Sequence, residues 1–319
     1  MIIQPEAMDF GGQKFSAIIY GPPGIGKTTL ALSAPKPVLI DFDRGISRVR
    51  AQHRKATIVC NTYEEVLRDV RSADMAEFET VVIDTGGSFV TFLKDWAFRT
   101  QSGAKTKNGD FNSLKGFGFV KSEFAGFTDE LKYVLNKHII YIFHSQEEKD
   151  KDGNTVQRLL CEGSARNTVW NPCDFGGFVQ VINGKRYIGF TPEQEYFAKG
   201  CHGIAGRYEI PELTADKPND FMTRLFEQAR ANIQAEADMF APVREQYEAT
   251  MAAAQLIIDG VNDAETANAA IAGIKDMEHA LTSRKELGEL LNAKAAACGL
   301  FFDKVLGQYT AALAKKEGK

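Results

Sequence analysis

The segment from Ser16 to Thr29, which reads S-A-I-I-Y-G-P-P-G-I-G-K-T-T, restricts the fold of this chain more than any other stretch. It fits the pattern G-x-x-x-x-G-K-[ST], with an apolar run before it and a run typical of a helix after it. Such a loop wraps its backbone N–H groups around phosphate oxygens, which requires residues with little or no side chain. The sequence therefore predicts a phosphate-binding loop between a strand and a helix, in preference to an ordinary Gly-Pro turn.

The residue types in this loop each serve one part of a nucleotide. Lys27 can reach the β and γ phosphates, and the Thr28 hydroxyl can bind Mg²⁺. The helix after the loop points the positive end of its dipole at the phosphates. We therefore expect ATP and Mg²⁺ as ligands. The residues expected to bind the nucleotide are Gly21, Pro22, Pro23, Gly24, Ile25, Gly26, Lys27, Thr28 and Thr29.

Polar side chains follow three short apolar runs, P-V-L-I, V-V-I and H-I-I-Y-I-F, which resemble buried strands of a parallel sheet. In open α/β sheets, ligands bind outside the carboxyl ends of the strands. The polar groups at these ends are Asp41 and Asp43, then Asp84, then His144 and Gln146. We expect them to meet the phosphates held by the loop.

The two acids after the first and second of these runs have different expected roles. Asp84 fits the pattern of four apolar residues and an aspartate that holds Mg²⁺ through its water shell. Thr85 follows it, so this strand supplies no Asp-Glu pair and no hydrolytic base. Asp43 could orient and deprotonate a water in line with the γ-phosphate. The alternative for Asp43 is a helix cap or a salt bridge to a neighbouring arginine.

Alternation of strands and helices, followed by a hairpin at Asn183-Gly184, predicts an α/β fold with a mainly parallel central sheet. From about residue 221 the chain is rich in Ala, Glu, Leu and Gln with helical spacing and one proline, Pro242. We therefore expect a lead-in over residues 1–14, a nucleotide-binding core over 15–217 and an all-helical domain over 218–319.

Composition excludes several classes of protein. With 319 residues, a net charge of −4 and a pI near 5.8, the chain has no overall field that attracts nucleic acid. Its five cysteines contain no C-x-x-C pair, which favours reduced thiols over a zinc site or disulfides. The beginning of the sequence is not that of a secretory signal, and no apolar run is long enough for a membrane span. The expected location is the cytoplasm.

The order and spacing of these motifs over residues 12–212 resemble the RecA-fold ATPases encoded by bacteriophages, including recombination proteins of the Sak single-strand-annealing type. The resemblance rests on G-P-P-G-I-G-K-T-T, P-V-L-I-D-F-D-R-G, V-V-I-D-T, I-I-Y-I-F-H-S-Q, and a hairpin with Arg186 before F-A-K-G. It implies a RecA-like core and an ATPase that acts on single-stranded DNA as a filament or ring, in the bacterial host cytoplasm. Expected partners are single-stranded DNA, further copies of the chain and a single-strand-binding protein.

The resemblance also implies roles for particular residues. Asp43 takes the place of the catalytic glutamate, His144 or Gln146 that of a γ-phosphate sensor, and Lys199 that of a cation reaching a neighbouring subunit's nucleotide. Asp43 is shorter than the usual glutamate, which implies slow hydrolysis. Cys201 stands where a second basic residue is expected, which leaves Lys199 or Arg207 to act in trans. An oligomer is also expected because residues 21–146 show no arginine evidently placed to neutralise the γ-phosphate.

A polar, Gly-rich stretch between residues 99 and 121 is the expected DNA contact. Its basic residues, set against the single acid Asp110, are Arg99, Lys105, Lys107, Lys115 and Lys121. Phenylalanines 111, 117 and 119 interleave with them. Cations and aromatic rings on one loop can neutralise phosphates and stack on bases. The alternative is a solvated loop whose phenylalanines belong to the core of the following helix.

Three functions fit these features. The first is a DNA-dependent recombination ATPase that performs annealing or strand exchange. The second is a nucleotide-dependent switch or scaffold without catalysis, which is favoured if Asp43 is not a base. The third is a small-molecule kinase, but residues 147–158 offer only Arg158 where a kinase lid carries several arginines. A GTPase is disfavoured because no N-K-x-D motif occurs.

Overall fold

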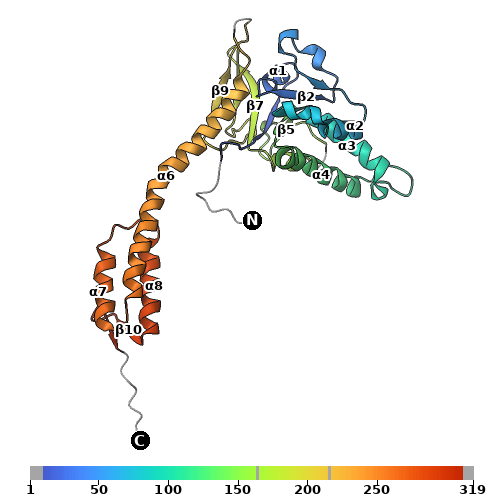
Figure 1. The fold of residues 1–319 in the computed structure, drawn as a ribbon. Helices are drawn as coiled ribbons and strands as arrows, with labels where there is room; N and C mark the ends of the chain where they lie inside the picture. Colours follow the sequence, from blue (N-terminus) through green and yellow to red (C-terminus); the bar gives the residue numbers. More distant parts are fainter. Residues whose placement is uncertain (1–9, 163–164, 215–216, 312–319) are drawn as a thin grey trace. The chain divides into compact units, whose positions relative to one another are not determined.

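The structure is a computed structural model that describes residues 10–162, 165–214 and 217–311. The chain forms two compact units, Met1–Ile233 and Gln234–Lys319, each described separately here (Figure 1). Residues 1–9, most of the predicted lead-in, lie outside the described residues.

The first unit is built on one sheet whose strands run in the order β3-β2-β4-β5-β1-β7-β8-β9. Neighbouring strands from β3 to β7 are parallel, and β8 and β9 are antiparallel additions at one edge. The strands are β1 (Ser16–Gly21), β2 (Pro37–Asp41), β3 (Thr57–Ile58), β4 (Thr80–Asp84), β5 (His138–Lys149), β6 (Thr155–Leu159), β7 (Phe175–Ile182), β8 (Lys185–Gly189) and β9 (Arg207–Ile210). Strand β6 pairs with the far end of β5. This arrangement confirms the predicted α/β fold with a mainly parallel sheet.

Helices cover both faces of this sheet because its central strands are apolar on both sides. In β1, Ile18 and Tyr20 belong to one buried cluster, while Ala17 and Ile19 belong to another. The first cluster includes residues of α2 (Tyr63–Val70), α3 (Gly86–Thr100), α4 (Ser113–Asp129) and α5 (Ala165–Trp170). The second includes residues of α1 (Lys27–Ala31) and the beginning of α6 (Phe221–Asp259). Complete burial of β1, β2 and β4 matches their uninterrupted apolar sequences.

The core ends later in the chain than residue 217. Met222, Phe226 and Ile233 on the first turns of α6 are buried in the second cluster. The Met222 N–H also donates to the Ser33 hydroxyl at 2.9 Å, and Arg230 approaches the buried His138 ring at 2.9 Å. The boundary between the units therefore falls after Ile233, inside α6. The sequence had predicted it earlier, in the polar stretch before the helix.

The second unit contains the remainder of α6, α7 (Ala264–Lys275), α8 (Ser283–Ala297) and a hairpin of β10 (Leu300–Asp303) and β11 (Gln308–Ala311). Asp263 begins α7 with a capping box, in which its carboxylate accepts from the Thr266 N–H at 2.9 Å. The expectation of an all-helical domain was wrong, because Leu300 and Tyr309 of the hairpin are buried against the helices. None of the described helices combines the length and apolar character of a membrane span.

Candidate nucleotide site

The loop between β1 and α1 has the backbone that the motif requires. Gly24 and Gly26 adopt positive φ angles of 77° and 92°, a region that side-chain-bearing residues rarely enter. The Lys27 side chain is only 5% exposed. Its ammonium donates to the carbonyls of Gly21 at 2.9 Å and Pro22 at 2.7 Å. A lysine folded back onto its own loop is held where a phosphate chain would lie, which fits the predicted role.

Thr28 and Asp84 come together from different elements. Register between β4, β5 and β1 brings the carboxyl ends of β4 and β1 to the same edge of the sheet. The Thr28 hydroxyl donates to the Asp84 carboxylate at 2.6 Å. A hydroxyl beside a carboxylate is the donor set that P-loop proteins offer to Mg²⁺ and its water shell. These two residues would hold the ion.

Burial shifts the pKa values of both charged groups in this part of the site. It raises the pKa of Asp84 to about 6, partly opposed by the Thr28 hydrogen bond and reinforced by Asp43 and Asp41. It lowers the pKa of Lys27 to about 8, partly opposed by Asp84. An anion at Lys27 and a cation at Asp84 would each favour the charged form of its partner. The site is therefore suited to a ligand that carries both charges, as Mg·ATP does.

The structure separates the roles of the two acids after β2. The Asp41 carboxylate is buried and accepts from the N–H groups of Gly45 and Ile46, both at 2.8 Å. Asp41 is therefore the cap of the following turn and is not available as a base. Asp43 is half-buried and lines the same cavity as Lys27. Of these two acids, Asp43 is therefore the one that remains the predicted base.

His144 lies beside the phosphate loop. It is paired with Gly21 in the β1–β5 register, and its Nδ1 is 3.4 Å from the Lys27 ammonium. Burial, with Lys27 as the next cause, lowers the pKa of the imidazole. A neutral histidine at this point could contact a terminal phosphate, as the sensor prediction requires.

A cavity of about 160 Å³ joins these residues. Its lining consists of Gly24, Gly26, Lys27, Thr28, Thr29, Asp43, Gly45, Arg48, Val49, Asp84, Ile142 and His144. Sequence reasoning missed Arg48, a cation within residues 21–146 that lines the phosphate cavity in the same chain. It lies in the short 3-10 helix Ile46–Arg48 and approaches the Asp43 carbonyl at 3.4 Å. Nothing in its sequence context distinguishes it from the neighbouring arginines 44, 50 and 54.

A second cavity of about 510 Å³ adjoins the first and shares Gly24, Gly26, Thr29 and Arg48 with it. Its remaining lining residues are Ile25, Arg50, His53, Val181, Arg186, Glu212 and Leu213. Arg186 touches the loop itself, because a Cβ on Gly26 would lie 2.6 Å from its Nη1. Because this atom ends a flexible side chain, the positive φ angle is the stronger reason for glycine at position 26.

Two residues predicted for the site lie outside the phosphate cavity. The Gln146 amide donates to Glu148 at 2.5 Å, and Glu148 is paired with Arg166. Lys199 pairs through its backbone with Gly176, near the beginning of β7, whereas the phosphate loop follows the ends of the parallel strands. Within its own chain, Lys199 therefore does not contribute to the nucleotide site. Arg207 is occupied by an ion pair with Glu193.

The predicted DNA contact is shorter and more ordered than its sequence indicated. Residues 102–104 form a turn of 3-10 helix, Lys105 bridges to Phe111, and α4 begins at Ser113. Lys105, Lys107 and Lys115 are exposed, while Lys121 is half-buried.

Arg99 and the nearby aromatic rings are occupied within the fold. Arg99 donates to Glu64 at 3.0 Å and to Asp95 at 2.8 Å. Phe111 and Phe117 pack edge to face with ring centres 5.5 Å apart. Together with Phe119, they pack against the core cluster beneath α3 and α4. This packing fits the alternative in which the phenylalanines belong to the core.

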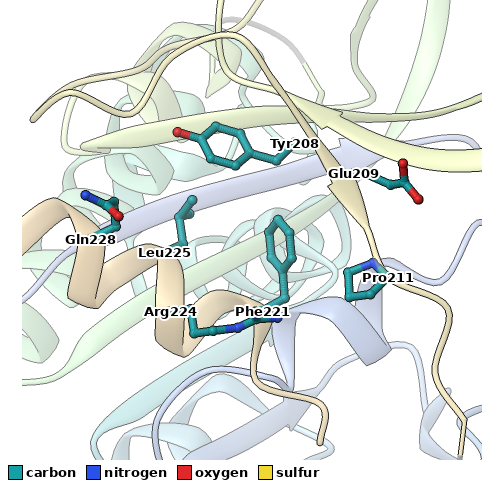
Figure 2. A pocket seen from close by; sticks show the side chains of 7 residues that line it. All are labelled: Tyr208, Glu209, Pro211, Phe221, Arg224, Leu225 and Gln228. Atoms are coloured by element: carbon teal, nitrogen blue, oxygen red, sulfur yellow. The ribbon is translucent and has the colours of Figure 1, made fainter. Parts of the chain in front are cut away.

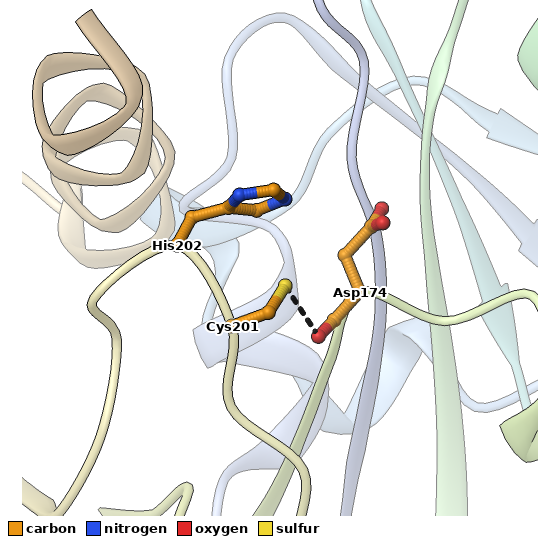
Figure 3. Close-up of side chains that lie close together, drawn as sticks. All are labelled: Asp174, Cys201 and His202. Carbon is orange, nitrogen blue, oxygen red and sulfur yellow. Dashed lines mark hydrogen bonds between the residues drawn. The ribbon is translucent and has the colours of Figure 1, made fainter. Parts of the chain in front are cut away.

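Two other features of the first unit lie apart from the phosphate cavity. A groove of about 530 Å³ lies between β9 and the first turns of α6, and Figure 2 shows the side chains that line it. Figure 3 shows Asp174, Cys201 and His202, which offer ligand atoms within 4.8 Å of one another. The Asp174 carboxylate already accepts from the Ser16 N–H at 2.7 Å and from Lys132 at 2.9 Å. With a lysine on that carboxylate, the cluster is better explained as a structural contact than as a cation site. All five cysteines are unpaired.

The parallel sheet, the glycine-rich loop with its lysine and the acids at adjacent strand ends together define a P-loop nucleotide-binding domain of the ATPase type. The chain belongs to the AAA domain family, whose sequence profile matches residues 13–202. The match begins just before β1 and includes the loop, Asp43, Asp84 and His144. A search of curated proteins finds no significant match.

Proposed function

We propose that the protein binds Mg·ATP and hydrolyses it. The observation that carries this proposal is the single cavity that Lys27, Thr28, Asp43 and Asp84 line together, two of whose charged groups have pKa values shifted towards neutrality. Mg²⁺, held at Thr28 and Asp84, would supply positive charge to the phosphate oxygens. The other steps are assigned to side chains of this chain.

Asp43 is the proposed general base. It orients a water and accepts a proton from it, and the oxygen of that water forms the new bond to the γ-phosphorus as the bond to the leaving ADP oxygen breaks. Lys27 binds the phosphates and His144 contacts the terminal one. Arg48 supplies a further positive charge from within the same chain, so an arginine from another subunit is not the only possible source.

We further propose that ATP turnover serves recombination on single-stranded DNA, through annealing or strand exchange by an oligomer. The support is the resemblance of the core motifs to phage-encoded RecA-fold ATPases and the exposed Lys105, Lys107 and Lys115. In an oligomer, Lys199 would act on a neighbouring subunit's nucleotide, because it lies away from its own. A single-strand-binding protein is a further proposed partner.

Measuring phosphate release from ATP, with and without single-stranded DNA and over a range of protein concentrations, tests these proposals together. Turnover that needs Mg²⁺ and rises with DNA and protein concentration is the expected result. Turnover that depends on neither DNA nor protein concentration would support the proposed ATPase activity and contradict the proposed role in recombination. ATP binding with no turnover under any condition would favour a nucleotide-dependent switch.

A further inference from the structure

The second unit contains an apolar groove that nucleotide chemistry does not explain. The groove has a volume of about 280 Å³ and lies between α7, α8 and the β10–β11 hairpin, which are drawn in Figure 1. Its apolar lining consists of Ile271, Ile274, Leu287, Leu291, Phe302 and Tyr309. A groove of this size accommodates an apolar side chain of a partner together with part of its backbone.

The wall formed by the hairpin is fixed in place. The Tyr309 hydroxyl donates to Asn292 at 2.5 Å, and the Tyr309 N–H donates to Asn268 at 2.7 Å. The rings of Phe302 and Tyr309 meet edge to face with centres 5.2 Å apart. Since these contacts connect β10 and β11 to both α7 and α8, the groove is preformed and a partner would not have to order it.

Gly288 leaves space on the floor of this groove. It lies in the interior of α8, where glycine is less favourable than almost any other residue. A Cβ built at this position meets no other atom within 4 Å, so no packing in the described fold requires a glycine there. The space above Gly288 is therefore open to a side chain from another molecule.

The charges along the groove are opposite to those of the unit that contains it. Residues 234–311 hold twelve acidic and six basic residues, yet the charged side chains lining the groove are cations and no carboxylate is among them. His279 is bonded within the unit, to the Ile274 carbonyl at 2.8 Å and to Ser283 at 3.1 Å. Lys275 and Arg284 are exposed, and neither forms an ion pair within the described residues. The two cations at the rim are thus available to an anionic partner.

We propose that this groove binds a short segment of a partner protein that carries an apolar anchor residue flanked by aspartate or glutamate. The anchor would occupy the space above Gly288, and the carboxylates would pair with Lys275 and Arg284. A preformed apolar pocket with a charged rim gives affinity through the anchor and selectivity through the charges. The proposal does not depend on the ATPase, because every residue it uses lies in the second unit.

The test is a selection of short random peptides on the full-length protein, followed by fluorescence polarisation with the enriched peptides. The Gly288→Leu variant fills the groove and should fold at least as stably, since leucine is the better helix former. Arg284→Glu reverses a charge at the rim. Lys285→Glu is its matched control, since Lys285 is adjacent on α8 but lies outside the groove and reaches Glu289.

Enriched peptides should combine an aromatic or aliphatic residue with acidic neighbours. They should bind Gly288→Leu and Arg284→Glu about tenfold or more weakly, and Lys285→Glu as tightly as the unmodified protein. The proposal is overturned if the unmodified protein enriches no peptide more strongly than the Gly288→Leu variant does. It is also overturned if the enriched peptides are basic, or if both groove variants bind them as tightly as the unmodified protein does. Self-association that Gly288→Leu abolishes would also overturn it, by making a second copy the occupant.

Discussion

Replacing Asp84, the buried acid of the proposed Mg²⁺ site, should make the folded protein more stable while impairing its binding of ATP with Mg²⁺. Asp84 is 9% exposed, and its carboxylate accepts a hydrogen bond from the Thr28 hydroxyl. Burial raises its pKa from 3.8 to about 6, and the acids at Asp43 and Asp41 add to this effect. The Asp84→Asn variant keeps the shape of the side chain and its acceptor for Thr28, but removes the charge.

The size and sign of the effect follow from the two pKa values. Because the folded chain holds this proton more tightly than the unfolded chain does, ionisation of Asp84 lowers the free energy of unfolding. At about 1.4 kcal/mol per pH unit, the cost reaches about 3 kcal/mol once the group is fully ionised. It is absent below about pH 4, grows between pH 4 and pH 6, and is complete above pH 6. The attraction to Lys27 is already contained in this pKa, so the variant should gain about 3 kcal/mol at pH 8, or roughly 6–12 °C in melting temperature.

Thermal unfolding of both proteins at pH 5 and pH 8, without nucleotide and with EDTA, measures this difference. The variant should melt higher than the unmodified protein at pH 8, with a smaller difference at pH 5. It should also lose most of the Mg²⁺-dependent part of ATP binding. A variant that is less stable at pH 8, or a difference that does not change with pH, would show that the folded protein does not raise the pKa of Asp84.

Three further outcomes test other parts of the account. Lys27→Ala should weaken ATP binding by about tenfold or more without lowering the melting temperature, because the lysine binds phosphate through a charge-assisted contact and does not pack the core. If titration calorimetry gives the variant the same ATP affinity as the unmodified protein, Lys27 does not bind the phosphates. Mg·ATP affinity of the unmodified protein should be highest between pH 6 and pH 8, since binding requires ionised Asp84 and protonated Lys27; a profile that stays flat from pH 5 to pH 9 would count against both assignments. A fragment ending at Lys217 should fail to fold, whereas one ending at Met239 should fold and bind ATP. The difference is the burial of Met222, Leu225, Phe226 and Ile233, which contributes about 1.5–3 kcal/mol of stability for each residue. Equal melting temperatures of the two fragments would place the start of α6 outside the core.

The parallel sheet could be predicted from the sequence because its signals are local. A continuously apolar strand such as Val38–Ile40, followed by an acid, indicates burial on both faces without knowledge of its neighbours. The hairpin at Asn183-Gly184 forms as predicted, with both residues at positive φ. The end of the core was misplaced because the burial of Met222 and Phe226 depends on contacts with residues almost two hundred positions earlier, such as Ser33. The β10–β11 hairpin was missed because its exposed Phe301 and Phe302 interrupt any alternating pattern.

Some residues of the candidate site could likewise be predicted from local sequence, and others depend on contacts that only the fold provides. Lys27, Thr28 and Asp84 follow from a motif and from a strand end, and the structure brings them together. The sequence favoured Asp43 as the base, but it could not show that Asp41 accepts the N–H groups of Gly45 and Ile46, because those contacts form only in the folded turn. Arg48 and Arg186 were not assigned to the site because only folding brings them to the phosphate loop.

The central claim, that Asp43 activates water for ATP hydrolysis in the cavity formed by the phosphate loop, is tested most directly by the Asp43→Asn variant. Single-turnover hydrolysis with protein in excess over ATP, together with binding of a fluorescent ATP analogue, separates the chemical step from binding. We expect the variant to bind the nucleotide and Mg²⁺ nearly as well as the unmodified protein but to hydrolyse ATP about a hundredfold or more slowly. Hydrolysis at the unmodified rate by a variant that binds normally would contradict it.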